Sequence, residues 1–186
     1  MAKKRIGKII SWILLTLAIF TLVLVFWPPG NASQPSDPVA AQSFDQKLTE
    51  LEEAHARGET SQVRLTGLEV NSKLQQVFAG LPPTGMTRMR GVAISLNQDH
   101  LVAVFSLKIL GVGLYITLGG KPGVQKHQLQ FDLDEVRLGR MPTSSSLISA
   151  VVKEKLSSQG GQEMMIMPDY ISSVHVENGE LVVESK

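Results

Sequence analysis

The side chains that could do chemistry in this chain are four histidines, one acidic cluster and one run of serines. No two histidines stand two or four positions apart, the spacing that places two metal ligands on one face of a strand or helix. The acidic cluster could perform acid–base catalysis or bind Ca²⁺, but its spacing matches no calcium-loop template and indicates a solvated bend. The residues concerned are His55, His100, His127 and His175, and Asp132, Asp134 and Glu135.

The serine run 144–146 precedes Lys153 and Lys155, which would suggest a Ser–Lys dyad. Serines at the start of an amphipathic helix are ordinary caps, and we favour that interpretation. The chain has no cysteine, which excludes disulfides, thiolate catalysis and zinc–thiolate sites. We therefore expect a non-enzymatic protein with no catalytic residue, no metal and no cofactor. A hydrolase with an unrecognised site is the least favoured alternative.

The segment 101–110, LVAVFSLKIL, is apolar at almost every position. An antiparallel strand with one wet face should alternate apolar and polar residues, so both faces of its first half need cover. Two explanations stay open: a central strand covered on both faces, or a strand with one face lining a groove or tunnel for a lipid chain. In the second, the lining residues are Leu101, Ala103, Phe105, Leu107, Ile109, Leu114, Ile116 and Leu118.

The elements around this segment predict an antiparallel meander. Residues 86–138 carry strand signals throughout, interrupted by Gly-, Asn- or Asp-containing turns at 97–100, 111–113 and 119–123. A short strand over 61–65 precedes the meander, and 124–133 is expected to be a separate strand after the glycine-rich turn. The chain closes in a hairpin whose turn is Asn178-Gly179, because both residues tolerate positive φ.

Residues 28–42 are rich in Pro, Ser, Ala and Gln and predict a flexible linker. A linker of this length spans roughly 20–25 Å. A helix follows over about 44–57, with Ser43 and Gln46 as its capping box.

A second helix begins after Thr66, with Glu69 reaching back as the other half of a capping box. Leu65 and Val70 are placed to form its hydrophobic staple. A third helix is expected over 145–156, where apolar residues recur at helical spacing. The buried face of the second helix is predicted to be Leu74, Val77 and Phe78.

The first 27 residues predict a membrane anchor. Four cations precede the uncharged stretch 9–27, which at ~1.5 Å per residue is about 28 Å long, close to the ~30 Å hydrocarbon core of a bilayer. Basic flanks stay in the cytoplasm, and Trp side chains prefer the headgroup region. An uncleaved signal anchor is favoured over a cleaved signal peptide. Its anchoring residues include Ile9, Trp12, Phe20, Phe26 and Trp27.

The overall charge of +1 conceals an acidic domain. Four of the 18 Lys and Arg residues lie in the first 27 positions, where there is no acid, so the remaining 14 face 17 Asp and Glu and the rest carries −3. This balance argues against nucleic acid as a partner and predicts no broad attraction to anionic lipid.

Three stretches carry a resemblance: 65–74 (LTGLEVNSKL), 136–142 (VRLGRMP) before an amphipathic helix, and the hairpin 176–183. With the meander between them, they resemble the YpmS/LmeA-like small membrane-anchored bacterial proteins over about residues 61–184. The resemblance implies a tubular lipid-binding (TULIP-like) domain, in which a curled antiparallel sheet wraps a long helix and encloses acyl chains. It implies no catalytic residues.

The sequence thus predicts an α+β fold: an N-terminal transmembrane helix, then a curled antiparallel β-sheet packed on two or three helices. The expected division is a cytoplasmic tail (1–8), a span (9–27), a linker plus short helix (28–60) and an extracytoplasmic domain (61–186). We expect a lipid- or hydrophobe-binding protein of the cell envelope, held in the inner or plasma membrane with its C-terminal domain periplasmic or extracellular. Its partner would be membrane lipid. The alternative is an accessory single-span subunit of a larger membrane protein complex.

Overall fold

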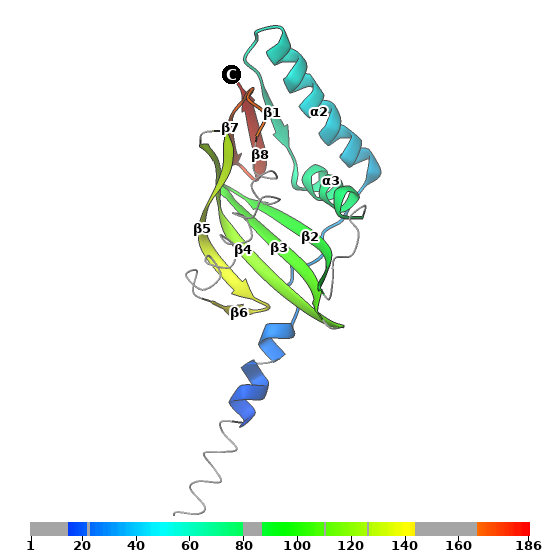
Figure 1. Cartoon of the computed structure of the whole chain (residues 1–186), viewed down its shortest axis with the longest axis vertical. Coiled ribbons are helices and arrows are strands. Elements are labelled where there is room, and N and C mark those ends of the chain that lie inside the picture. The colour runs from blue at the N-terminus through cyan, green and yellow to red at the C-terminus, as the bar shows by residue number, and fades with distance from the viewer. Residues whose placement is uncertain (1–14, 22, 80–86, 110, 126, 144–166) are drawn as a thin grey trace, which may run out of the picture.

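The computed structural model describes residues 15–21, 23–79, 87–109, 111–125, 127–143 and 167–186 (Figure 1). These residues form an α+β fold with two antiparallel sheets, ordered β1-β8-β7 and β2-β3-β4-β5-β6, which confirms the predicted class. Residues 15–21 and 23–26 are also helical. The elements are α2 (Pro38–Ala56), β1 (Gln62–Leu65), α3 (Gly67–Ala79), β2 (Thr87–Asn97), β3 (His100–Ile109), β4 (Val112–Gln125), β5 (Gln128–Leu138), β6 (Met141–Pro142), β7 (Ile171–Glu177) and β8 (Glu180–Ser185).

The core lies where the two sheets and the two helices meet. One cluster joins α2, α3 and the three-stranded sheet, and Val124 and Leu129 pack against it from β4 and β5. A second cluster joins β2 and β3 to Val176 of β7. In Figure 1, α2 and the three-stranded sheet lie at the top, and the helical residues 15–21 and 23–26 project from the bottom. The five-stranded sheet therefore lies between the first core cluster and the N-terminal helical residues.

The predicted start of α3 is confirmed. The Glu69 carboxylate accepts the Thr66 amide at 2.7 Å, and the Thr66 hydroxyl accepts the Glu69 amide at 3.3 Å, as a capping box requires. Leu65 and Val70 lie in the same core cluster. The expected burial of Val77 is wrong, because this side chain is 50% exposed.

The prediction for α2 is wrong at its start. The helix begins at Pro38, with Asp37 as N-cap accepting the Val39 amide at 2.9 Å. Proline suits the first helical turn, where its missing N–H would have had no helical partner. Ser43 lies inside the helix and bonds to Glu69 instead of capping. Because Leu51 is completely buried in the first cluster, α2 belongs to the domain core and not to a linker.

The expected turn at 119–123 is also wrong. β4 runs through these glycines as one strand to Gln125, with a register shift between Gly119 and Gly120 opposite β5. A Cβ at Gly120 would overlap the carbonyl oxygen of Asp132, so the close approach of the two backbones requires glycine. The chain turns later, around His127, whose φ is +60°.

The remaining sheet predictions agree with the structure. β2, β3, β4 and β5 form the expected meander, and the closing hairpin turns through Asn178 (φ +52°) and Gly179 (φ +80°). The third helix, expected over 145–156, lies outside the described residues.

Within the part of the chain that the structure describes, no helix is both long and apolar enough to cross a bilayer. Residues 9–14 and 22 of the expected span lie outside that part.

Candidate functional site

The predicted lining residues share one face of the five-stranded sheet. Directly opposite residues of an antiparallel pair point to the same face, and the register of β3 and β4 matches three predicted pairs. The face extends to β2, where Val92 is opposite Phe105, and to β5, where Leu138 is opposite Ile116. The three pairs are Ala103 with Leu118, Phe105 with Ile116, and Leu107 with Leu114.

The upper half of this face is filled by the protein itself. Leu101 and Ala103 are buried in the second core cluster with Val176, and Leu74 packs against the same cluster. On the opposite side of the sheet Val104 is completely buried. The interpretation of a central strand covered on both faces therefore holds for this half of β3.

The lower half of the face is only half-buried. We call Phe105, Leu107, Leu114, Ile116 and Leu138 the proximal apolar face. Next to it, Val112 at the start of β4 is exposed. Leu118, in the row above, is also half-buried, and the side chain of Ile109 lies outside the description. The proximal apolar face is thus the part of the predicted lining that is still accessible.

The N-terminal helical residues end at this lower half of the sheet. The turn between β5 and β6 meets them: the Arg140 amide donates to the Leu24 carbonyl at 2.9 Å, and the Arg140 Nε donates to the Pro28 carbonyl at 3.3 Å. The Arg140 guanidinium also stacks over the Trp27 ring at 5.2 Å, a cation–π contact.

Glycine at position 139 makes this junction possible. Its φ is +61°, and a Cβ there would overlap the carbonyl oxygens of Leu24 and Val25. The Gly139 amide donates to the Tyr115 carbonyl of β4 at 2.7 Å, which ties the same turn to the sheet. The helix end and the proximal apolar face are therefore held next to each other.

All three of the predicted anchoring residues that can be placed are exposed. Phe20 is 59% exposed, and Phe26 and Trp27 also face outward. Further exposed apolar side chains lie on the same helical residues: Leu15, Leu17, Ile19 and Val23. Ile9 and Trp12 lie outside the described residues.

The chain between the helix and α2 lies against the domain. Gln34 donates to the Ser95 hydroxyl at 3.2 Å and accepts from Gln75 at 3.2 Å. The Asp37 amide then donates to Ser72 Oγ at 2.9 Å. These bonds attach a segment that the sequence predicts to be a free linker.

The edge of β2 beside this segment is closed by Asn71, a buried residue of α3. Its side chain accepts the Ile94 amide at 2.6 Å and donates to the Ile94 carbonyl at 2.7 Å. Asn71 thus occupies the place of a neighbouring strand at one position of an otherwise open edge. A pocket of about 280 Å³ lies between this edge and Gln34, and another of about 450 Å³ lies over Gly123 and Phe131; neither is lined by the proximal apolar face.

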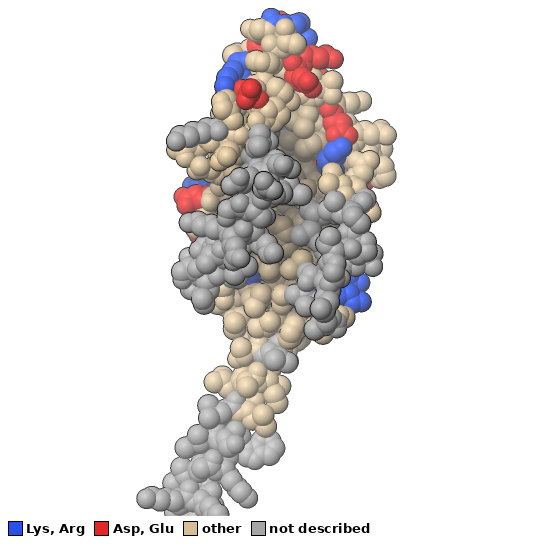
Figure 2. Space-filling model, viewed as in Figure 1, with Lys and Arg blue, Asp and Glu red and all other residues tan. Residues whose placement is uncertain are grey.

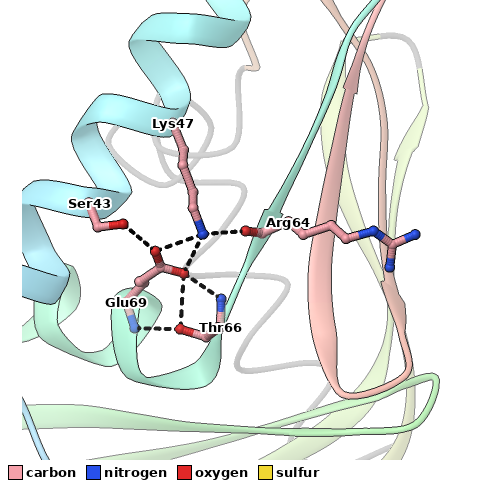
Figure 3. Close-up of polar contacts among 5 residues, drawn as sticks. All are labelled: Ser43, Lys47, Arg64, Thr66 and Glu69. Atoms are coloured by element: carbon pink, nitrogen blue, oxygen red, sulfur yellow. Dashed lines mark hydrogen bonds and ion pairs between the residues drawn. The ribbon is translucent and has the colours of Figure 1, made fainter.

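A polar network around the buried Glu69 joins α2, β1 and α3 (Figure 3). The Glu69 carboxylate accepts from Ser43 at 2.5 Å, from Lys47 at 2.8 Å and from Thr66, while Lys47 also donates to the Arg64 carbonyl at 2.7 Å. Burial raises the pKa of Glu69, but the hydrogen bonds from Lys47, Ser43 and Thr66 outweigh it and lower the pKa to about 2. Glu69 is therefore a permanently charged structural group with its oxygens occupied, unsuited to proton transfer.

Two members of the acidic cluster that the sequence singles out have partners. An Asp134 carboxylate oxygen lies 2.8 Å from Nε2 of His100, and Glu135 forms an ion pair with Arg137. Among the residues described, no group of three His, Asp or Glu side chains could hold a metal ion. The residues of the Ser–Lys dyad alternative fall in 144–166, outside the description.

Sequence reasoning misses the junction at Arg140. The motif 136–142 is noted there only as part of a resemblance. No local pattern indicates that its turn meets the N-terminal helix, more than a hundred positions earlier. The glycine at 139 is the one signal that could have pointed to a close backbone approach.

No family model, no curated protein and no solved structure matches this chain. The resemblance to YpmS/LmeA-like proteins stays a prediction from the sequence.

Proposed function

We propose that this chain is a membrane-anchored, non-enzymatic protein that binds a lipid or a similar hydrophobe on the extracytoplasmic side of a cell-envelope membrane. The observation that carries the proposal is the position of the proximal apolar face, directly beside the docked end of the N-terminal helix. Residues 9–27 would be the anchor, with the apolar side chains exposed between Leu15 and Trp27 in contact with lipid.

The face can contact part of one acyl chain. From Phe105 to Leu107 the strand advances by about 7 Å at ~3.4 Å per residue. Half of a ~30 Å hydrocarbon core, the depth of one leaflet, is about 15 Å. Each methylene moved from water onto such a face contributes about 0.8 kcal/mol. An acyl chain that leaves the bilayer beside Trp27 would therefore find apolar contact along about half of its length.

Because the helix end is bound to the domain, the distance between the sheet and the membrane would be set by this contact and not by a flexible linker. With Arg140 and Gly139 tied to the helix, the lower edge of the sheet would stand at the headgroup level and not a linker's length away. This arrangement supports lipid as the neighbour of the face.

Photo-crosslinking in native membranes tests the proposal. A photoreactive aromatic amino acid replaces Leu114 in the proximal apolar face of the full chain, or Val39, an exposed valine of α2, as the matched control. We expect phospholipid adducts at position 114 and few at position 39. A second probe at Leu107 guards against a misfolded variant, since both positions belong to one pair.

The same experiment distinguishes lipid binding from the accessory-subunit function. A defined protein adduct at 114 and 107, without lipid, would establish the accessory-subunit function and reject lipid binding. Adducts of neither kind would reject both functions for this face.

A further inference from the structure

Five of the 14 cations after residue 27 lie in stretches of sequence that contain no acid. The described residues of these three stretches, 87–93, 105–116 (without 110) and 136–143, form the lower end of the five-stranded sheet. They contain no Asp or Glu, although the domain as a whole is acidic. Their cations are Arg88, Arg90, Lys108, Arg137 and Arg140.

The strand register places Lys108 at this end, and Arg90 lies at the register shift between Met89 and Gly91 of the neighbouring strand. Lys108 is paired with Arg88 on one side and with Gly113 on the other. Gly113 is two residues from Tyr115, whose carbonyl binds the turn that carries Arg140. Figure 2 shows the acidic side chains in the upper and middle part of the visible face, away from the N-terminal helix.

Three of these cations lack an acidic partner. Elsewhere the described cations are mostly paired, as Lys47 is with Glu69 and Lys73 with Asp45. Within the described part of the chain, no Asp or Glu lies within ion-pair distance of Arg90, Lys108 or Arg140, and all three are exposed. Arg88 is opposite Lys108 in the strand register, and like charges at directly opposite positions destabilise a sheet.

We propose that Arg90, Lys108 and Arg140, the proximal basic rim, bind the phosphates of anionic phospholipid headgroups. This inference rests on the proposed function, because it requires the anchor to hold the rim at the bilayer surface. Arg140 is the member whose position is fixed by the most contacts. Its Nε donates to the Pro28 carbonyl and its guanidinium lies over the Trp27 ring. Its two terminal nitrogens can still donate to one phosphate in a bidentate contact.

The rim changes what the net charge implies. A net charge of −3 predicts no broad attraction of the domain to an anionic surface, yet the three stretches at the lower end of the sheet contain no acid. A cation close to an anionic leaflet strengthens binding by about fivefold. Three such cations favour the orientation that places the rim on the headgroups by a factor on the order of a hundred.

Nanodiscs containing the full chain test the inference. The chain has no cysteine, so Val112→Cys accepts a single fluorescent label beside the rim. A quencher attached to lipid headgroups then reports how closely the rim approaches them. We expect strong quenching in discs containing phosphatidylglycerol and weaker quenching in pure phosphatidylcholine. The difference should disappear at ~1 M salt, where the screening length is about 3 Å.

Paired variants assign the effect. The double variant Arg90→Gln, Lys108→Gln leaves the contacts of Arg140 with the helix intact. It should lower the ratio of molecules whose rim lies on the headgroups to those whose rim does not by about 25-fold. Arg57→Gln with Lys186→Gln removes the same charge from exposed positions outside the rim and should change nothing. Equal quenching in both lipids, or equal behaviour of both variants, overturns the inference.

The outcome is separable from that of the proposed function. If lipid adducts form at Leu114 while quenching is equal in discs with phosphatidylglycerol and in pure phosphatidylcholine, only the basic rim is refuted. If headgroup quenchers also leave the fluorescence of Trp12 and Trp27 unchanged, the anchor is refuted, and the proposed function and the basic rim are refuted with it. A protein crosslink that the rim variant alone abolishes would assign the rim to an acidic partner and reject the lipid phosphate.

Discussion

Replacing Glu69 by glutamine should remove one defined part of the acid sensitivity of this domain. The carboxylate is buried, with its side chain 8% exposed, and its pKa is lowered from 4.5 to about 2 in the folded state. A folded-state pKa below the unfolded value stabilises the fold above the unfolded pKa, and this stabilisation is lost as the pH falls from about 4.5 to about 2. At 1.36 kcal/mol per pKa unit the contribution is about 3 kcal/mol.

Glu69→Gln keeps the shape and can still accept a hydrogen bond, but it gives up the charge that faces Lys47. We expect the variant to be about 2–3 kcal/mol less stable at pH 7 and the difference to vanish near pH 2. Urea unfolding of the full chain in a mild non-ionic detergent, followed by circular dichroism across pH 7 to 2, measures both. Glu50→Gln, an exposed change on α2, is the matched control.

Two results would refute this reasoning. The variant and the parent could lose stability in parallel between pH 5 and 2, which would mean that other carboxylates carry the acid sensitivity. The variant could also be as stable as the control at pH 7, which would mean that the network contributes nothing net.

Three further substitutions test contacts that only the folded chain reveals. Gly120→Ala should destabilise by about 2 kcal/mol or more because its Cβ would overlap a carbonyl oxygen of β5, while Gly123→Ala, with open space around it, should be nearly neutral in the same unfolding assay. Asn71→Leu should cost about 2–4 kcal/mol and speed hydrogen exchange at the Ile94 amide, since two buried bonds are lost. Gly139→Ala should detach the N-terminal helix and increase proteolysis after Pro28, while a cleavage rate equal to that of the parent would contradict the junction.

Local signals in the sequence predict local structure well. The capping box of Thr66 and Glu69 and the hairpin turn Asn178-Gly179 each involve backbone groups within a few residues. The local sequence therefore contains all the groups that form them. The meander follows for the same reason, because short turns leave antiparallel pairing as the simplest arrangement.

The errors come from residues whose role is set by distant partners. Ser43 has the type and spacing of a cap, but its hydroxyl binds Glu69 on another helix. The glycines 119–123 have the composition of a turn, but Gly120 serves the close approach of β5. In both cases the same residue type satisfies two different requirements, and only the tertiary fold decides which one applies.

The candidate site was also predicted only in part, for the same reason. The register confirms that the predicted lining residues share a face, because strand periodicity fixes which side chains point together. Periodicity does not say which part of the face the protein covers. Leu101 and Ala103 are buried by Val176 from the far end of the chain, whereas Leu107 and Leu114 are left half-exposed.

The net charge of the sequence does not show where the charges lie on the folded domain. A net charge of −3 predicts a domain indifferent to anionic lipid, provided that the charges are evenly mixed. The fold instead brings three acid-free stretches, far apart in sequence, to the sheet end that meets Trp27. An acid farther from that end than one screening length, about 8 Å at physiological salt, contributes little there. In the proposed orientation, the sign of the interaction with a membrane is set by the rim and not by the total charge.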